Sequence, residues 1–507
     1  MEALNKRLAS ELEATKRQHA EQMNEMKALL QKGGVRPENP IEAPVPPAVN
    51  RGVGDGPAPS MGNPGYDDVE TPVPDYTEGV FSPYLPPSGF PVPTPPGREP
   101  ARLPLNGTFG PGFRFQTENQ EFRLQLHIGS QFETRLWGDG GGLPGSSGVF
   151  LPRQRLILNG NITKPVEYEF AINRGLNSFD LLNAFVNLHF DDRFQLRIGR
   201  YFTPLTYDQY AIPTWWMPTP ERSLYTTNVG LNRQVGIMGW GYLFDERLDY
   251  AAGFFNGSRN SFQSLNNGAD FVGYLNVRPF QHWVSSPARF LNMGSSVSFG
   301  YQDQNAVPVA FRVGAISPDA VAPGVGTVPF LILNPGVIER GNRLLGSVHS
   351  AYYYRSLSLI GEWQYGYGNY SMPGRPTSTQ VPFSGFYATA GYFLTGEQVE
   401  RRTWVDPLRP FVPLSRNLPR GPGAWEAVAR VSRLGLGDQI FKGGFADPNL
   451  WSNSAITTEV GLNWYWNRYV KVSTFWLHGA FGEPVTYRPG DRHNNADMFW
   501  TRFQLYF

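Results

Sequence analysis

A two-residue alternation of apolar and polar side chains is the feature that most restricts how this chain can fold. In the segment 122–136, one face carries the apolar residues Phe122, Leu124, Leu126, Ile128, Phe132 and Leu136. The same alternation recurs at 154–162, 194–199, 425–431 and 459–466. Such runs are longer than the usual strand of about 5–6 residues, and a tilted strand needs about 9–11 residues to cross a bilayer. The alternation therefore predicts long strands with one apolar face and one polar, water-exposed face.

Two architectures share this alternation, a soluble β-sandwich and a membrane barrel. A sandwich would pack an apolar set rich in Val, Ile and Leu inward, whereas here that set is dense in aromatic residues, as in "YYY" at 352–354 and "WYW" at 464–466. Aromatic residues make up 14% of the chain and charged residues 17%, and a soluble domain usually has roughly 25% charged residues. Aromatic girdles are typical of strands that cross a membrane. We therefore predict an all-β transmembrane barrel.

The last residues, "TRFQLYF", continue the alternation up to Phe507. Phe499, Thr501, Phe503, Leu505 and Phe507 fall on one face of the expected strand. A closing strand must pair with the first strand because a barrel leaves no free edge. The residues Phe503, Leu505 and Phe507 also resemble the C-terminal signal that bacterial barrel assembly machinery reads, so this machinery is an expected partner.

The first hundred residues have a different character. In residues 1–34, five side chains follow the heptad spacing of a coiled-coil seam, namely Leu12, His19, Met23, Met26 and Leu30. This spacing predicts a coiled-coil helix. Residues 35–104, with 18 prolines between Pro37 and Pro100, predict an extended linker, and residues 105–507 form the expected barrel. The start of the chain shows no apolar h-region of a secretory signal. A helix on a long spacer suggests a tether to cell wall or another envelope layer.

Several functional classes are disfavoured by composition and motif. The formal net charge of +1 argues against a nucleic-acid partner, and the absence of cysteine excludes disulfide scaffolds and thiolate metal sites. The seven histidines form no H-E-x-x-H motif, and there is no G-x-S-x-G elbow or Walker loop. We therefore expect no enzymatic activity, no catalytic residues, no cofactor and no metal site.

Residues 197–241 resemble the phosphate-selective porin family. The similar elements are "IGRYFTP" (198–204), the pair Glu221-Arg222, and "RQVGI" (233–237), with further collinear matches at 384–397, 423–438 and 457–472. The resemblance covers roughly residues 110–507. It implies an outer-membrane porin that forms a homotrimer of barrels of about 16 antiparallel strands, with a loop folded into each pore. With termini facing the periplasm, the N-terminal region is expected to be periplasmic.

Charged residues on the polar face of the strands are the candidate pore residues. After residue 100 the chain has 35 Lys and Arg against 29 Asp and Glu, and arginine binds oxyanions bidentately. The candidates for contact with anions are Arg123, Arg135, Arg153, Arg155, Arg197, Arg222, Arg233 and Arg430. The candidate lumen acids are Glu133, Glu169, Glu221, Glu426 and Glu459. These acids could instead pair with the arginines and hold the barrel shape, which is the alternative for each arginine taken singly.

The expected function is a water-filled channel in the outer membrane for passive diffusion of small hydrophilic solutes and ions, with a mild anion preference. Members of the resembled family that are specific for phosphate carry a lysine-rich constriction, whereas this segment has only Lys164, Lys442 and Lys471. A general channel is therefore favoured over a high-affinity phosphate channel. The alternative is a structural protein whose N-terminal coiled coil links envelope layers.

Overall fold

The computed structural model describes residues 103–138, 142–176, 178–264, 268–316, 326–374, 377–412 and 421–507. The chain divides into two compact units, Met1–Pro64 and Gly65–Phe507, and all described residues belong to the second unit. The predicted coiled coil and nearly all of the predicted linker therefore lie outside the described residues.

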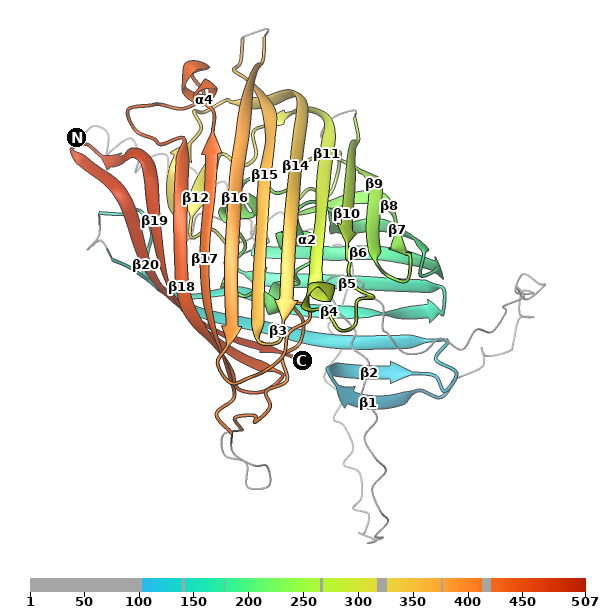
Figure 1. Ribbon diagram of the computed structural model, residues 1–507. Coiled ribbons are helices and arrows are strands. Elements are labelled where there is room, and N and C mark those ends of the chain that lie inside the picture. Colours follow the sequence, from blue (N-terminus) through green and yellow to red (C-terminus); the bar gives the residue numbers. More distant parts are fainter. Residues whose placement is uncertain are drawn as a thin grey trace, which may run out of the picture. The chain divides into compact units, whose positions relative to one another are not determined.

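Among the described residues, sixteen antiparallel strands form a sheet that closes on itself, because the last strand pairs with the first along Met498–Tyr506 and Gly129–Trp137 (Figure 1). Each of the other strands pairs with its neighbours in chain order, so the predicted barrel is confirmed. The strands are β3 (Arg123–Trp137), β4 (Gly148–Thr163), β5 (Val166–Gly175), β6 (Ser178–Asp191), β7 (Phe194–Phe202), β8 (Arg233–Leu243), β9 (Leu248–Phe255), β10 (Asp270–Val277), β11 (Leu291–Asn305), β14 (Ile338–Tyr354), β15 (Leu357–Ser371), β16 (Thr379–Phe393), β17 (Ala424–Leu436), β18 (Ser454–Tyr465), β19 (Val470–Arg488) and β20 (Asp491–Tyr506).

The two faces of the wall are inverted relative to a soluble protein. On β3 the apolar Phe132 and Leu136 are about half exposed, whereas the polar Gln131, Glu133 and Arg135 between them are almost fully buried. On β20 the inward set is Trp500, Arg502, Gln504 and Tyr506, as the alternation predicts. A sheet whose oily side is outermost needs an apolar surrounding, which a lipid bilayer supplies.

A short hairpin extends the wall below the end of β20. Strand β2 (Gly112–Gln116) pairs with the first residues of β3, and β1 (Asn106–Gly110) pairs with β2. The backbone of Phe507 exchanges hydrogen bonds with Ile128 just above this point. The ring of Phe507 also lies 6.2 Å from Phe109 and 6.3 Å from Phe113. The hairpin thus pairs the part of β3 that the last strand does not reach.

The connections differ at the two ends of the barrel. We call the end where β3 begins and β20 ends the terminal end, and the other the far end. At the far end, the connections 203–232 and 306–337 are long, and the second holds β12 (Ala310–Val313) and β13 (Val328–Ile332). Most terminal-end turns are short, but residues 394–423 form a long connection there. Trp404 of this connection is buried against Trp216 and Tyr506.

The helices are short and lie in connections between the strands. They are α2 (Tyr207–Tyr210), η1 (Thr214–Trp216), α3 (Leu224–Asn228), η2 (Pro287–Phe290) and α4 (Gln439–Lys442). In the part of the chain that the structure describes, no helix is both long and apolar enough to span a membrane.

The inverted wall generates a first prediction. Val460 lies in the middle of β18, between Ala429 and Trp476 on the neighbouring strands, and its side chain faces outward. The change Val460→Arg should lower folding stability by about 2–4 kcal/mol, the cost of a lipid-facing arginine near the bilayer midplane. Urea-dependent folding into lipid vesicles measures this cost. Val460→Leu is the control and should change little; an arginine variant as stable as this control would contradict the lipid-facing assignment.

Candidate pore and solute site

Residues 203–232, here called the inner loop, cross the inside of the barrel. Almost every residue of the loop is buried, and its backbone is held by side chains from several strands. The carboxylate of Glu362 on β15 accepts hydrogen bonds from the amides of Tyr207 at 2.9 Å and Asp208 at 3.3 Å. On other sides, Asn463 and Gln504 donate to loop carbonyls at 2.7 and 2.8 Å. Buried backbone groups need such partners, so the polar lumen face fixes the path of the loop.

Local sequence explains the turns within the inner loop. The hydroxyl of Ser223 accepts a hydrogen bond from the amide of Thr226 and begins α3, and Thr206 begins α2 in the same way. The guanidinium of Arg222 donates to the backbone oxygens of Asp208 in α2 and of Ile212, and so links the middle of the loop to the segment around α2. Side chains that satisfy helix ends in this way let very short helices persist.

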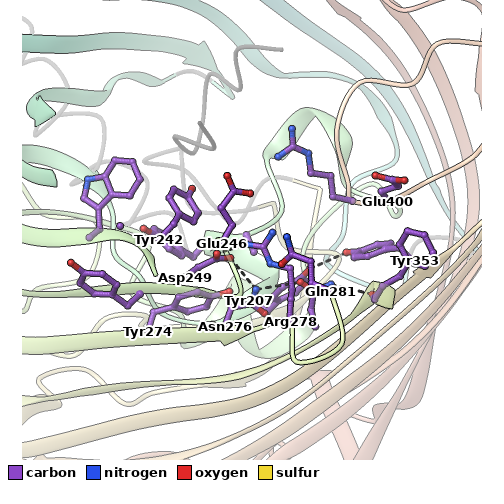
Figure 2. A pocket seen from close by; sticks show the side chains of 18 of the residues that line it. Tyr207, Tyr242, Glu246, Asp249, Tyr274, Asn276, Arg278, Gln281, Tyr353 and Glu400 are labelled. Carbon is purple, nitrogen blue, oxygen red and sulfur yellow. Dashed lines mark hydrogen bonds and ion pairs between the residues drawn. The ribbon is translucent and has the colours of Figure 1, made fainter. Parts of the chain in front are cut away.

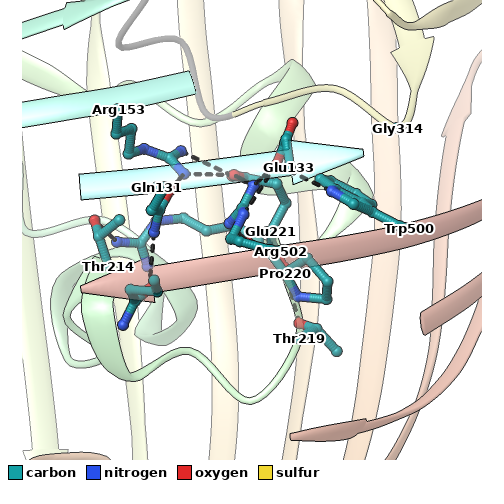
Figure 3. A network of polar contacts seen from close by, with 12 residues as sticks. Gln131, Glu133, Arg153, Thr214, Thr219, Pro220, Glu221, Gly314, Trp500 and Arg502 are labelled. Atoms are coloured by element: carbon teal, nitrogen blue, oxygen red, sulfur yellow. Dashed lines mark hydrogen bonds and ion pairs between the residues drawn. The ribbon is translucent and has the colours of Figure 1, made fainter. Parts of the chain in front are cut away.

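A buried network of charges fastens the tip of the inner loop to the wall (Figure 3). Glu221 of the loop receives both terminal nitrogens of Arg153 at 2.6 and 3.0 Å, and a nitrogen of Arg502 at 2.8 Å. Arg502 also binds Glu133 at 2.6 Å, and the indole of Trp500 donates to Glu133 at 3.0 Å. The ion-paired side chains are at most 3% exposed. Because each charge has a partner, the desolvation cost is offset and the loop is held in one place.

Other predicted pore residues also form ion pairs. Arg135 binds Glu133 at 2.7 Å and donates to the carbonyls of Gly314 and Gly326 in the connection 306–337. Arg430 pairs with Glu459 at 2.6 Å and donates to the carbonyl of Arg222 at 3.0 Å. Arg135 therefore holds the connection 306–337, and Arg430 holds the inner loop, while both place positive charge inside the barrel.

The remaining predicted arginines have different surroundings. Arg197 lies over the rings of Phe185 and Trp240, at 4.4 and 5.0 Å from their centroids. Arg155 lies 5.3 Å from the ring of Trp215, and Arg233 donates to Asn183 at 2.7 Å. Guanidinium groups over aromatic faces are attracted by the negative charge density of the ring face. Arg123, at the start of β3, is half-buried, and Glu169 accepts a hydrogen bond from Asn183.

Three residues that hold this site together were not among the predicted site residues. Arg502 lies on the inward phase of the last strand and could have been found from the alternation. Glu362 on β15 is likewise on the polar phase, but nothing in the sequence indicates that it binds a loop more than 150 residues away. Arg402 pairs with Glu426 at 2.6 Å, and it lies in an irregular connection where no periodicity exists.

The connection 394–423 meets the inner loop inside the barrel. The ring of Trp404 lies 5.1 Å from Trp216 of the inner loop and 5.1 Å from Tyr506 of β20. Trp404 is buried, and the neighbouring Arg402 is buried beside Glu426. Burial by itself lowers the pKa of Arg402, but the partner carboxylate and nearby tyrosines leave that pKa raised. The connection 394–423 from the terminal end and the inner loop from the far end therefore narrow the lumen together.

A cavity of about 440 Å³ remains between the inner loop and the terminal end of β8, β9, β10 and β11 (Figure 2). Aromatic, amide and charged side chains line it, including Tyr207, Tyr242, Tyr274, Asp249 and Arg278. Among the described residues there is no group of three or more His, Asp or Glu side chains that could hold a metal ion.

A closed barrel with an oily exterior, a charged interior and a loop folded inward is the architecture of an outer-membrane porin. The chain belongs to the family of phosphate-selective porins O and P, whose sequence model matches residues 122–507. This membership confirms the resemblance seen in the sequence, and it indicates a channel rather than an enzyme.

The individual matches are more distant. The chain is similar to Porin O of Pseudomonas aeruginosa, at 28% identity over 127 residues, which is 25% of this chain and 27% of that relative. The match thus spans only about a quarter of the relative's length. The anion-selective porin from Comamonas acidovorans aligns over 76% of this chain and 100% of its own, at 10% identity and a TM-score of 0.45. The channel DcaP of Acinetobacter baumannii aligns over 78% and 99%, at 7% identity and a TM-score of 0.45.

The buried charge network generates a second prediction. Glu221→Gln removes the negative charge that Arg153 and Arg502 share, leaving two buried arginines with too few counter-charges. Breaking a buried pair from one side costs about 3–5 kcal/mol, so the urea midpoint of the folded barrel should fall. Glu118→Gln, at an exposed carboxylate between β2 and β3, is the matched control and should leave the midpoint unchanged. Equal effects of the two changes would show that the network does not anchor the loop.

Proposed function

We propose that the protein is a passive channel of the outer membrane, which small hydrophilic solutes and ions cross by diffusion. The observation that carries this proposal is the inverted barrel, whose polar face is turned inward around a fixed loop. A polar face turned inward can line an aqueous path, and a barrel of sixteen strands is wide enough to enclose one. The inner loop and the connection 394–423 would then set the width of that path.

The selectivity that we propose is a mild preference for anions rather than tight binding of phosphate. Three buried carboxylates, Glu133, Glu221 and Glu459, pair with the four arginines Arg135, Arg153, Arg430 and Arg502, so most of the positive charge of these arginines is offset and one unit remains. The excess of basic over acidic residues rests on this unit and on the other arginines. Lys471 is buried and donates to the carbonyl of Met217 at 2.7 Å, which gives it an anchoring contact instead of a free charge.

Assembly is part of the same proposal. The outward-facing Phe503, Leu505 and Phe507 would be read by the barrel assembly machinery, and three copies would associate in the membrane as a homotrimer. The N-terminal region would lie in the periplasm. The tethering alternative has no observation in its favour, because its coiled coil, 1–34, and nearly all of its linker, 35–104, lie outside the described residues and outside the family match.

The decisive experiment is single-channel recording from purified protein in planar lipid bilayers under a salt gradient. We expect discrete conductance steps, and a reversal potential that indicates weak selectivity for anions. Absence of steps from correctly folded, heat-resistant protein would overturn the channel proposal. A clear cation selectivity would overturn the anion preference alone.

Arg197 provides the third prediction. Its charge lies over aromatic rings, and within the described residues it forms no ion pair with a carboxylate. A unit positive charge stabilises an anion and destabilises a cation 4 Å away in water by about 1 kcal/mol each, so Arg197→Gln should lower the anion-to-cation permeability ratio by at most about 25-fold. Reversal potentials in a salt gradient give this ratio. Arg193→Gln, at an exposed turn arginine paired with Asp191, is the control; an equal shift in both variants would contradict the assignment.

A further inference from the structure

We propose that the cavity between the inner loop and the terminal end of β8–β11 is a binding site for a neutral polyhydroxylated solute, such as a small saccharide. This inference rests on the proposed channel function and names a class of solute for it. The cavity, about 440 Å³ in volume, is lined by both β-strands and α2 of the inner loop. A solute that passes the terminal end would meet it before reaching the inner loop.

Aromatic side chains dominate the walls of this cavity. Six of them are Tyr207, Tyr210, Trp240, Tyr242, Tyr250 and Tyr274. The ring of Tyr210 meets that of Tyr274 edge to face at 4.9 Å, and Trp240 meets Tyr242 in the same manner at 6.0 Å. These contacts hold the rings in fixed orientations. A sugar ring has an apolar C–H face and a polar rim, which matches rings that are apolar in the middle and carry a hydroxyl at the edge.

The charges that line the cavity are balanced. The acids are Glu246, Asp249 and Glu400, and the bases are Arg278, Arg289 and Arg401. Arg278 and Asp249 form an ion pair, and the amide of Asn276 donates to Asp249 at 3.0 Å. A site for a free anion such as phosphate needs an excess of positive charge, which this cavity lacks. A balanced polar lining instead suits a neutral ligand with many hydroxyl groups.

Hydrogen-bonding groups are available along the same walls. Gln281 lines the cavity, and its side-chain oxygen is buried with no hydrogen-bond partner among the described residues. This oxygen can accept a hydrogen bond from a hydroxyl, which would remove the cost of leaving it unsatisfied. Burial raises the pKa of Tyr210 in the inner loop to about 12, so its hydroxyl remains protonated and able to donate. Figure 2 shows Gln281 between Arg278 and Tyr353 in this lining.

The test compares two probes, maltose as the neutral solute and inorganic phosphate as the anion, in single-channel recordings from the full-length protein. We expect maltose to interrupt the ionic current in a saturable manner and phosphate to do so more weakly. Gln281→Leu and Tyr242→Leu should each weaken the maltose block by about tenfold, through loss of one hydrogen bond or one stacking surface. Tyr392→Leu, an exposed outward tyrosine of β16, should leave the block unchanged.

The outcomes separate this inference from the channel proposal. Maltose block that both cavity variants weaken supports the site. Conductance steps with no saturable maltose block, block that is equal in all variants, or stronger block by phosphate would each overturn the site while leaving the channel intact. If no steps occur, the channel proposal fails, and maltose titration of the detergent-solubilised protein by tryptophan fluorescence then decides the site by itself. A maltose response that Gln281→Leu weakens supports it, and no response overturns it.

Discussion

The whole structure depends on one constraint: inside a bilayer, every backbone amide and carbonyl must find its partner within the protein. The wall meets this constraint only because β20 pairs with β3 and closes the sheet. The hairpin β1–β2 then pairs the first residues of β3, which β20 does not reach. Closure turns the alternation of each strand into an inside and an outside, so the polar face of every strand converges on one lumen.

A lumen lined with charge brings a second requirement, because buried charges are costly unless they are paired. The protein meets it with carboxylate–arginine networks such as that of Glu133, Glu221, Arg153 and Arg502. The same contacts hold the inner loop across the barrel. The same ion pairs therefore both anchor the loop and neutralise buried charge, and several of the arginines that were expected to attract anions contact the loop. The cavity beside the loop stays open near the terminal end.

Much of the fold could be predicted from the sequence. The strict alternation predicted the strands and the closing role of "TRFQLYF", because a period of two over ten or more residues is that of a β-strand. The aromatic residues of the apolar face then predicted that this face lies outward. Individual pairings could not be predicted. Arg402 meets Glu426 from an irregular connection, and Glu362 meets the start of α2 from across the barrel. No local pattern encodes contacts between segments that far apart in sequence.

The sequence by itself therefore determined that the chain is a barrel with an oily exterior and a polar interior, since hydrophobic patterning acts strand by strand. The tertiary structure alone decided where the inner loop lies, which charges neutralise one another, and where an aromatic cavity stays open. These depend on which side chains of sixteen strands meet in the middle of the barrel. The curvature of the closed sheet determines which side chains come into contact across the lumen. The sequence of one strand does not indicate which strand will lie opposite it.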